Sequence, residues 1–133
     1  MKTRILIIDD DMSLTHVVKL NLEATGEYEV HIINYAPHAI QAAREFRPHL
    51  ILLDYIMPDL DGGDISAILR DDPQLSRIPV VMVTALVSNR EMANDGSIIR
   101  NGHLMVAKPI RFEKLRHIIH DNLSAMEHDL AFH

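Results

Sequence analysis

The chain has 133 residues, of which 47% are apolar and 24% are charged, the balance of one ordinary globular domain. It contains no cysteine, which excludes thiolate metal sites, thiol catalysis and a disulfide scaffold. The formal net charge is −6, no run of Lys and Arg stands out, and no apolar stretch approaches the length of a membrane span, so neither nucleic acid nor a membrane is an expected partner.

The first half of the chain alternates between short apolar runs and amphipathic segments. Ile5–Ile8 ends in acids and predicts a buried strand, and Met12–Thr25 carries apolar residues at helical spacing. Tyr28–Asn34 is more mixed and predicts an edge strand. Pro37–Phe46 predicts a shorter helix, because its apolar residues again recur at helical spacing.

The second half of the chain continues this alternation. Leu50–Leu53 and Pro79–Val83 predict buried strands, and Ile65–Arg70 between them predicts a short helix. Leu104–Ala107 predicts the last strand, and Phe112–Leu123 predicts the last helix.

The connection to the last strand is expected to hold the fourth helix. Asn89–Asn101 must cross back over the sheet, yet it contains Asn94–Ser97, a turn-like cluster that opposes helix formation. A Gly in the middle of a helix costs about 1 kcal/mol relative to Ala. We therefore expect this segment to be a poor helix former.

Strands that alternate with helices imply βαβ units, with right-handed crossovers and helices on both faces of a parallel sheet. Runs that are apolar at every position agree with strands buried on both faces. The expected fold class is α/β, with five strands and about five helices. We expect one domain over residues 1–124, followed at 125–133 by an extension of the last helix or a tail.

Polar residues follow four of the predicted strands. Asp9 and Asp10 come after the first strand, Asp54 after the third, Thr84 after the fourth and Lys108 after the last. The C-terminal ends of parallel strands share one edge of the sheet, where open α/β sheets bind their ligands. We therefore expect these distant residues to meet at one place.

The residue types in this set indicate a particular chemistry. Three carboxylates brought together repel one another and are costly to desolvate unless a cation lies among them. Oxygen ligands without His or Cys suit Mg²⁺. A Lys ammonium and a Thr hydroxyl opposite the acids can hold phosphoryl oxygens. The set predicts formation and loss of an aspartyl phosphate.

Four segments together resemble the receiver domains of response regulators in two-component signalling. They are Ile7–Asp11, Leu52–Gly62, the pair Thr84-Ala85 and the pair Lys108-Pro109. Each segment alone is weak, but all four in this order and spacing are strongly specific, and the resemblance covers about residues 3 to 123. It implies a flavodoxin-like doubly wound sheet with strand order 2-1-3-4-5.

The resemblance also implies a role for each site residue. Asp54 would accept a phosphoryl group from the phosphohistidine of a sensor histidine kinase or phosphotransfer protein. Mg²⁺ would be bound by Asp9, Asp10, Asp54 and the backbone carbonyl of Ile56. The phosphoryl oxygens would be held by Thr84, Lys108 and the backbone of Ala85. The Lys108-Pro109 peptide bond would be cis.

The chain departs from the family pattern at the position where receivers usually carry a switching Tyr or Phe. This position, three residues before Lys108, holds Met105, which is unbranched and fills gaps without one defined pose. The stretch that precedes it is also about two residues longer than is common. We therefore expect activation to proceed by ordering or shifting of Asn89–Asn101 rather than by a rotamer change at Met105.

Two other functional classes fit the sequence less well. A phosphatase with an Asp nucleophile would need a second acid two residues after it, where this chain has the apolar Ile56. An interaction module without phosphorylation would not need the complete set of acids, Thr and Lys. Asp11 is expected to be a helix N-cap, and Asp59 and Asp61 to be loop and cap residues rather than ligands.

The expected protein is thus a signalling phosphoacceptor rather than a metabolic enzyme. The lack of cysteine suits a reducing cytoplasm. The kinase, the downstream effector and the oligomeric state are not specified by the sequence, which is compatible with a homodimer.

Overall fold

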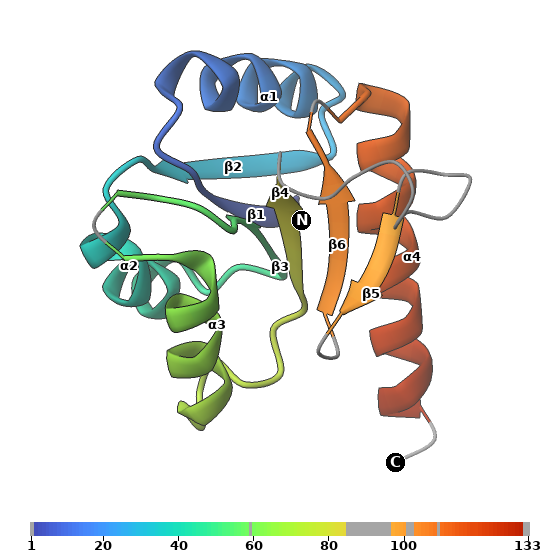
Figure 1. Ribbon diagram of the computed structural model, residues 1–133. Coiled ribbons are helices and arrows are strands. Elements are labelled where there is room, and N and C mark those ends of the chain that lie inside the picture. Colours follow the sequence, from blue (N-terminus) through green and yellow to red (C-terminus); the bar gives the residue numbers. More distant parts are fainter. Residues whose placement is uncertain (1, 59, 85–96, 101–102, 109, 132–133) are drawn as a thin grey trace.

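The computed structural model describes residues 2–58, 60–84, 97–100, 103–108 and 110–131. Strands and helices alternate along most of this chain (Figure 1). The first half comprises β1 (Thr3–Ile8), α1 (Met12–Ala24), β2 (Tyr28–Ile33), the 3₁₀ turn η1 (Ala36–His38), α2 (Ala39–Phe46) and β3 (Leu50–Asp54). The second half comprises α3 (Gly62–Asp71), β4 (Val80–Thr84), β5 (Ser97–Arg100), β6 (His103–Ala107) and α4 (Phe112–Ala131).

All strands belong to one six-stranded sheet with the order β2-β1-β3-β4-β6-β5. The first five strands in this order are parallel to one another, which confirms the expected α/β class and the order 2-1-3-4-5. In the register of these strands, Ile8 lies beside Leu53, Asp54 beside Val83, and Thr84 beside Ala107. The C-terminal ends of the four central strands therefore lie along one edge.

The sixth strand, β5, corrects the expectation of a helix over Asn89–Asn101. Ser97–Arg100 pair antiparallel with β6, and Arg100 faces His103, so only the Asn-Gly pair at 101–102 connects the two strands. Asn-Gly is the pair favoured in two-residue hairpins, and the β-branched Ile98 and Ile99 favour a strand. Residues 89–96 and 101 of the expected helix lie outside the described residues. The described part of the chain thus has four α-helices instead of about five.

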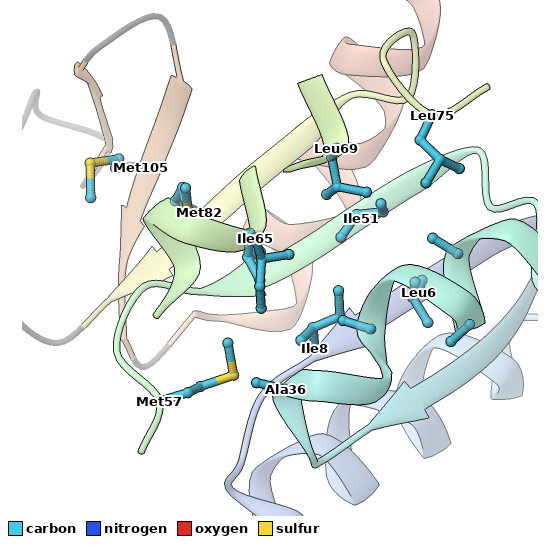
Figure 2. Close-up of a cluster of buried hydrophobic side chains, with 14 residues drawn as sticks. Leu6, Ile8, Ala36, Ile51, Met57, Ile65, Leu69, Leu75, Met82 and Met105 are labelled. Carbon is cyan, nitrogen blue, oxygen red and sulfur yellow. The ribbon is translucent and has the colours of Figure 1, made fainter. Parts of the chain in front are cut away.

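Two apolar clusters hold the helices against opposite faces of the sheet. Alternate residues of β1 point to opposite faces, so Leu6 and Ile8 contact one cluster, with α2 and α3, while Ile5 and Ile7 contact the other, with α1 and α4. Figure 2 shows the first cluster, where the side chains of Ile65 and Leu69 from α3 lie over the sheet. The sheet is therefore buried on both faces, and the site must lie at its edge.

The two N-caps are as predicted, whereas the start of α3 and the end of α4 differ from the predicted bounds. Asp11 is the N-cap of α1 and Asp61 that of α3, as expected for both residues. The helix α3 begins at Gly62, three residues before the predicted start. The last helix continues to Ala131, while the division into a domain and an extension at 124 stays a prediction. Among the described residues, no helix combines the length and the apolar character needed to cross a membrane.

Candidate functional site

Three acidic residues gather at the C-terminal ends of β1 and β3. Asp9 and Asp10 follow β1, Asp54 is the last residue of β3, and each offers a carboxylate oxygen within 4.8 Å of the others. Asp9 is 5% exposed and Asp54 is 6% exposed, whereas Asp10 is open to solvent. The predicted meeting of the three acids is thus observed, with two of them largely removed from water.

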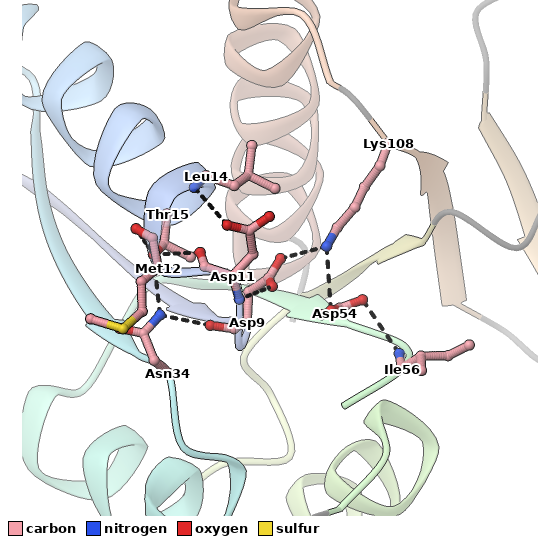
Figure 3. Close-up of polar contacts among 9 residues, drawn as sticks. All are labelled: Asp9, Asp11, Met12, Leu14, Thr15, Asn34, Asp54, Ile56 and Lys108. Atoms are coloured by element: carbon pink, nitrogen blue, oxygen red, sulfur yellow. Dashed lines mark hydrogen bonds and ion pairs between the residues drawn. The ribbon is translucent and has the colours of Figure 1, made fainter. Parts of the chain in front are cut away.

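Lys108 reaches the same place from the end of β6. Its Nζ lies 2.8 Å from Oδ2 of Asp9 and 3.3 Å from Oδ2 of Asp54 (Figure 3). Its backbone N–H donates to the carbonyl oxygen of Thr84 at 2.9 Å, which continues the β4–β6 pairing up to the site. Burial alone would lower the pKa of Lys108, but the hydrogen bond and charge of Asp9, together with Asp54, raise it above its ordinary value.

The carboxyl of Asp54 has an unusual protonation equilibrium. Burial, followed by the negative charge of Asp9, raises its pKa to about 6. Lys108 and the backbone N–H of Ile56 oppose this rise, and that N–H donates to Oδ1 of Asp54 at 3.3 Å. Asp54 is therefore a carboxylate at neutral pH that is held at a cost in free energy. A perturbed acid of this kind, facing a fixed cation, is typical of a functional site.

A network of hydrogen bonds holds the turn formed by residues 9–11, which we call the acidic turn (Figure 3). The backbone N–H of Asp11 donates to Oδ1 of Asp9 at 2.9 Å, and Oδ1 of Asp11 caps α1 by accepting from the N–H of Leu14 at 3.0 Å. Nδ2 of Asn34 donates to the carbonyl oxygen of Asp9 at 2.7 Å and to Oγ1 of Thr15 at 3.1 Å. Asn34 and Thr15 were missed by the sequence analysis, because nothing local marks a contact between residues 25 positions apart.

The other predicted site residues have different surroundings. Thr84 is buried at the end of β4, and the side chain of Ile56 is 50% exposed beside Asp54. Met105 is 4% exposed and lies opposite Met82 in the β4–β6 register, within the cluster of Figure 2. Ala85 and Pro109 lie outside the described residues, as does the expected cis bond between Lys108 and Pro109.

Gly62 allows the loop after β3 to pack directly behind Asp54. Its N–H donates to the carbonyl oxygen of Tyr55 at 2.8 Å, and a Cβ at this position would lie 2.5 Å from the carbonyl oxygen of Asp54. Both groups belong to the backbone and cannot turn aside. The site thus needs glycine here because of a close approach.

Gly62→Ala is expected to lower the free energy of unfolding by about 2 kcal/mol, the size of an overpacking strain. Gly63→Ala is the matched control, because a Cβ there meets only Oδ1 of Asp61, at 3.1 Å, on a side chain that can adjust. Urea midpoints of the two variants and the wild type provide the comparison. Equal stability of the two variants would contradict the close approach.

Comparisons with known proteins identify a family whose fold agrees with the observed sheet. The family model of the response regulator receiver domain matches residues 5–120. The chain is 40% identical over 85 residues to the DNA-binding response regulator MtrA of Mycobacterium leprae, a match that covers 64% of this chain but 36% of the length of MtrA. A response regulator from Desulfuromonas acetoxidans has a similar structure, with a TM-score of 0.76 at 26% identity over 92% of this chain and 98% of that one.

A further solved structure is the signal receiver domain of a signal transduction histidine kinase from Syntrophus aciditrophicus. It matches with a TM-score of 0.73 at 28% identity, over 92% of this chain and 91% of that one. A response regulator and the receiver domain of a kinase thus share the fold of this chain. The family match extends from the first strand into the last helix and includes every described residue of the candidate site. The chain therefore belongs to the response regulator receiver domain family.

Proposed function

We propose that this chain is the phosphoacceptor switch of a two-component phosphorelay and that Asp54 accepts the phosphoryl group. The observation that supports this proposal is the surroundings of Asp54, whose carboxylate lies 3.3 Å from Nζ of Lys108 and within 4.8 Å of the carboxylates of Asp9 and Asp10. A carboxylate nucleophile with a fixed cation and two further acids beside it is suited to phosphoryl transfer.

The acidic cluster fits Mg²⁺ by the chemistry of its donors. Asp9, Asp10 and Asp54 offer only oxygen, and no His or Cys belongs to the group. Mg²⁺ prefers one or two carboxylates together with water and phosphate oxygens. Asp10 is exposed and Ile56, whose carbonyl is a proposed ligand, is half exposed, so water and a phosphoryl group have room beside these residues. When bound, Mg²⁺ supplies positive charge that offsets the acids and the incoming phosphoryl group.

Each of the site residues would have a separate role in the transfer of the phosphoryl group. An oxygen of Asp54 forms a bond to phosphorus while the bond from phosphorus to the imidazole nitrogen of the donor breaks, and the nitrogen keeps the electron pair. Nζ of Lys108 is placed to stabilise one phosphoryl oxygen. We assign to the hydroxyl of Thr84 and the backbone of Ala85 the role of holding the other phosphoryl oxygens. Attack of water on phosphorus later breaks the bond to Asp54, which releases inorganic phosphate and returns Asp54 to a carboxylate.

The competing classes remain weaker. The position two residues after Asp54 is Ile56, half exposed and apolar, so an Asp-based phosphatase would lack its general acid there. A pure interaction module would have no use for a buried carboxylate whose pKa is raised to about 6. We therefore keep the proposal of a phosphoacceptor without a metabolic activity of its own.

The proposed partners follow from this role. A sensor histidine kinase or phosphotransfer protein in the cytoplasm would supply the phosphoryl group, and a downstream effector would read the result. MtrA is described as DNA-binding, but this chain matches 36% of it, and its net charge of −6 argues against direct contact with nucleic acid. Met105 occupies the usual switch position, and we keep the proposal that activation proceeds by ordering or shifting of residues 89–101 rather than by a rotamer change at Met105. Of that connection, Ser97–Arg100 is described.

The test is phosphorylation of the whole chain by a small donor such as acetyl phosphate, with the modified residue mapped by mass spectrometry. We expect label on Asp54 alone, none in Asp54→Asn and none in the presence of a chelator. Asp64→Asn is the matched control, because Asp64 is an exposed acid of α3 outside the cluster. Labelling of the Asp54→Asn variant equal to that of the wild type, or labelling that is unchanged by the chelator, would refute the assignment.

A further inference from the structure

The three acids of the site are not held in the same way. Oδ2 of Asp9 contacts Nζ of Lys108 and its Oδ1 accepts from the N–H of Asp11, while Asp54 contacts Lys108 and the N–H of Ile56. Within the described residues, no hydrogen bond or ion pair holds the carboxylate of Asp10, which is exposed. The place of this carboxylate therefore depends on the backbone of the acidic turn.

That backbone is held from the neighbouring strand. The carbonyl of Asp9 belongs to the peptide unit that joins Asp9 to Asp10, and Nδ2 of Asn34 donates to it at 2.7 Å from the end of β2. The second hydrogen of the same amide goes to Oγ1 of Thr15, which is 2% exposed. Oγ1 of Thr15 in turn lies 3.0 Å from the carbonyl oxygen of Asp11, at the other end of the turn.

We propose that Asn34, supported by Thr15, is a positioning residue for the metal site. The peptide unit is planar, so fixing its carbonyl restricts the two dihedral angles that aim the side chain of Asp10. Without a metal ion the ammonium of Lys108 faces three carboxylates, so the acids still repel one another, and this repulsion favours opening of the turn. The amide of Asn34 resists the opening and keeps Asp10 beside the other two carboxylates before the ion arrives. This inference rests on the proposed function, because it concerns the same Mg²⁺ site.

The test measures Mg²⁺ binding by the unphosphorylated protein, with the backbone amides monitored by NMR during a titration with Mg²⁺. Asn34→Leu keeps the approximate size of the side chain and removes both donors. We expect it to raise the dissociation constant for Mg²⁺ roughly tenfold, as loss of a group that orients a metal ligand does. The rate of phosphorylation at saturating Mg²⁺ should stay near that of the wild type, while the half-saturating Mg²⁺ concentration rises in parallel.

Matched variants separate positioning from a general loss of stability. Asn122→Leu removes a comparable amide hydrogen bond, 2.7 Å to the carbonyl oxygen of Ile118, far along α4, and should leave Mg²⁺ affinity unchanged. Thr15→Val should weaken binding, and Thr15→Ser, which keeps the hydroxyl, should restore it. In an Asp10→Asn background, Asn34→Leu should cause little further weakening, because the residue that it positions is already altered.

The outcomes distinguish this inference from the proposed function. Wild-type affinity for Mg²⁺ in both Asn34→Leu and Thr15→Val would overturn the role of Asn34 and leave the proposed function standing. A wild-type protein that does not bind Mg²⁺ would overturn both. If Asn34→Leu does not fold, the pair Thr15→Val and Thr15→Ser decides alone, and equal affinities in that pair would refute the proposal.

Discussion

Replacing Asp54 by Asn is expected to raise the free energy of unfolding of the metal-free protein at pH 7 by about 2–3 kcal/mol. The pKa of Asp54 is about 6 in the folded protein against an ordinary value of 3.8. The folded state therefore binds this proton more tightly than the unfolded chain does. The resulting stabilisation is complete below pH 3.8 and is lost as the pH rises through 6, whereas Asn stays neutral throughout.

Urea unfolding in the presence of a chelator, at several pH values between 4 and 7.5, measures this effect. The difference between variant and wild type should be largest at neutral pH and should shrink steadily as the pH falls toward 4. Mg²⁺ should reduce it as well, because the ion stabilises the ionised acids of the wild type. Asp10→Asn should give a smaller gain, since Asp10 is exposed. A difference that does not change with pH would show that Asp54 is not held at a cost.

Replacing Lys108 by Met is expected to lower the free energy of unfolding of the metal-free protein at pH 7 by about 3 kcal/mol, because removing one partner of a buried ion pair leaves uncompensated charge. Nζ of Lys108 lies within 3.3 Å of both Asp9 and Asp54. The Lys side chain is 18% exposed and the two Asp side chains 7% and 8%, so screening by solvent is limited. Met keeps an unbranched apolar side chain, so the loss of charge dominates.

The double variant Lys108→Met/Asp54→Asn gives the sharpest form of this experiment. With one carboxylate already neutral, loss of the ammonium should cost clearly less than it does in the wild type. Lys114→Met is the matched control, because Lys114 belongs to α4 and has no ion pair with any described residue. Equal effects of Lys108→Met in the two backgrounds would mean that Lys108 and Asp54 do not interact.

The sequence alone determined the central parallel strands, the edge of the sheet that carries the acids, and two helix N-caps. The apolar runs at Ile5–Ile8 and Leu50–Leu53 identified buried parallel strands, because only strands covered on both faces are apolar at every position. The acids that follow these runs could then be assigned to one edge without any knowledge of distance. The N-caps Asp11 and Asp61 were equally local, since a cap depends on residues three positions away.

The structure decided what depends on the pairing of distant segments. Ser97–Arg100 forms a strand because it pairs with β6, whereas a helix was expected over Asn89–Asn101 because this segment must cross back over the sheet. The Asn101-Gly102 pair is a local hairpin signal that this expectation did not use. The contact from Asn34 to the carbonyl oxygen of Asp9 and the raised pKa of Asp54 arise only after folding. Each depends on which groups are buried together, and burial is a property of the packed chain rather than of any short stretch of it.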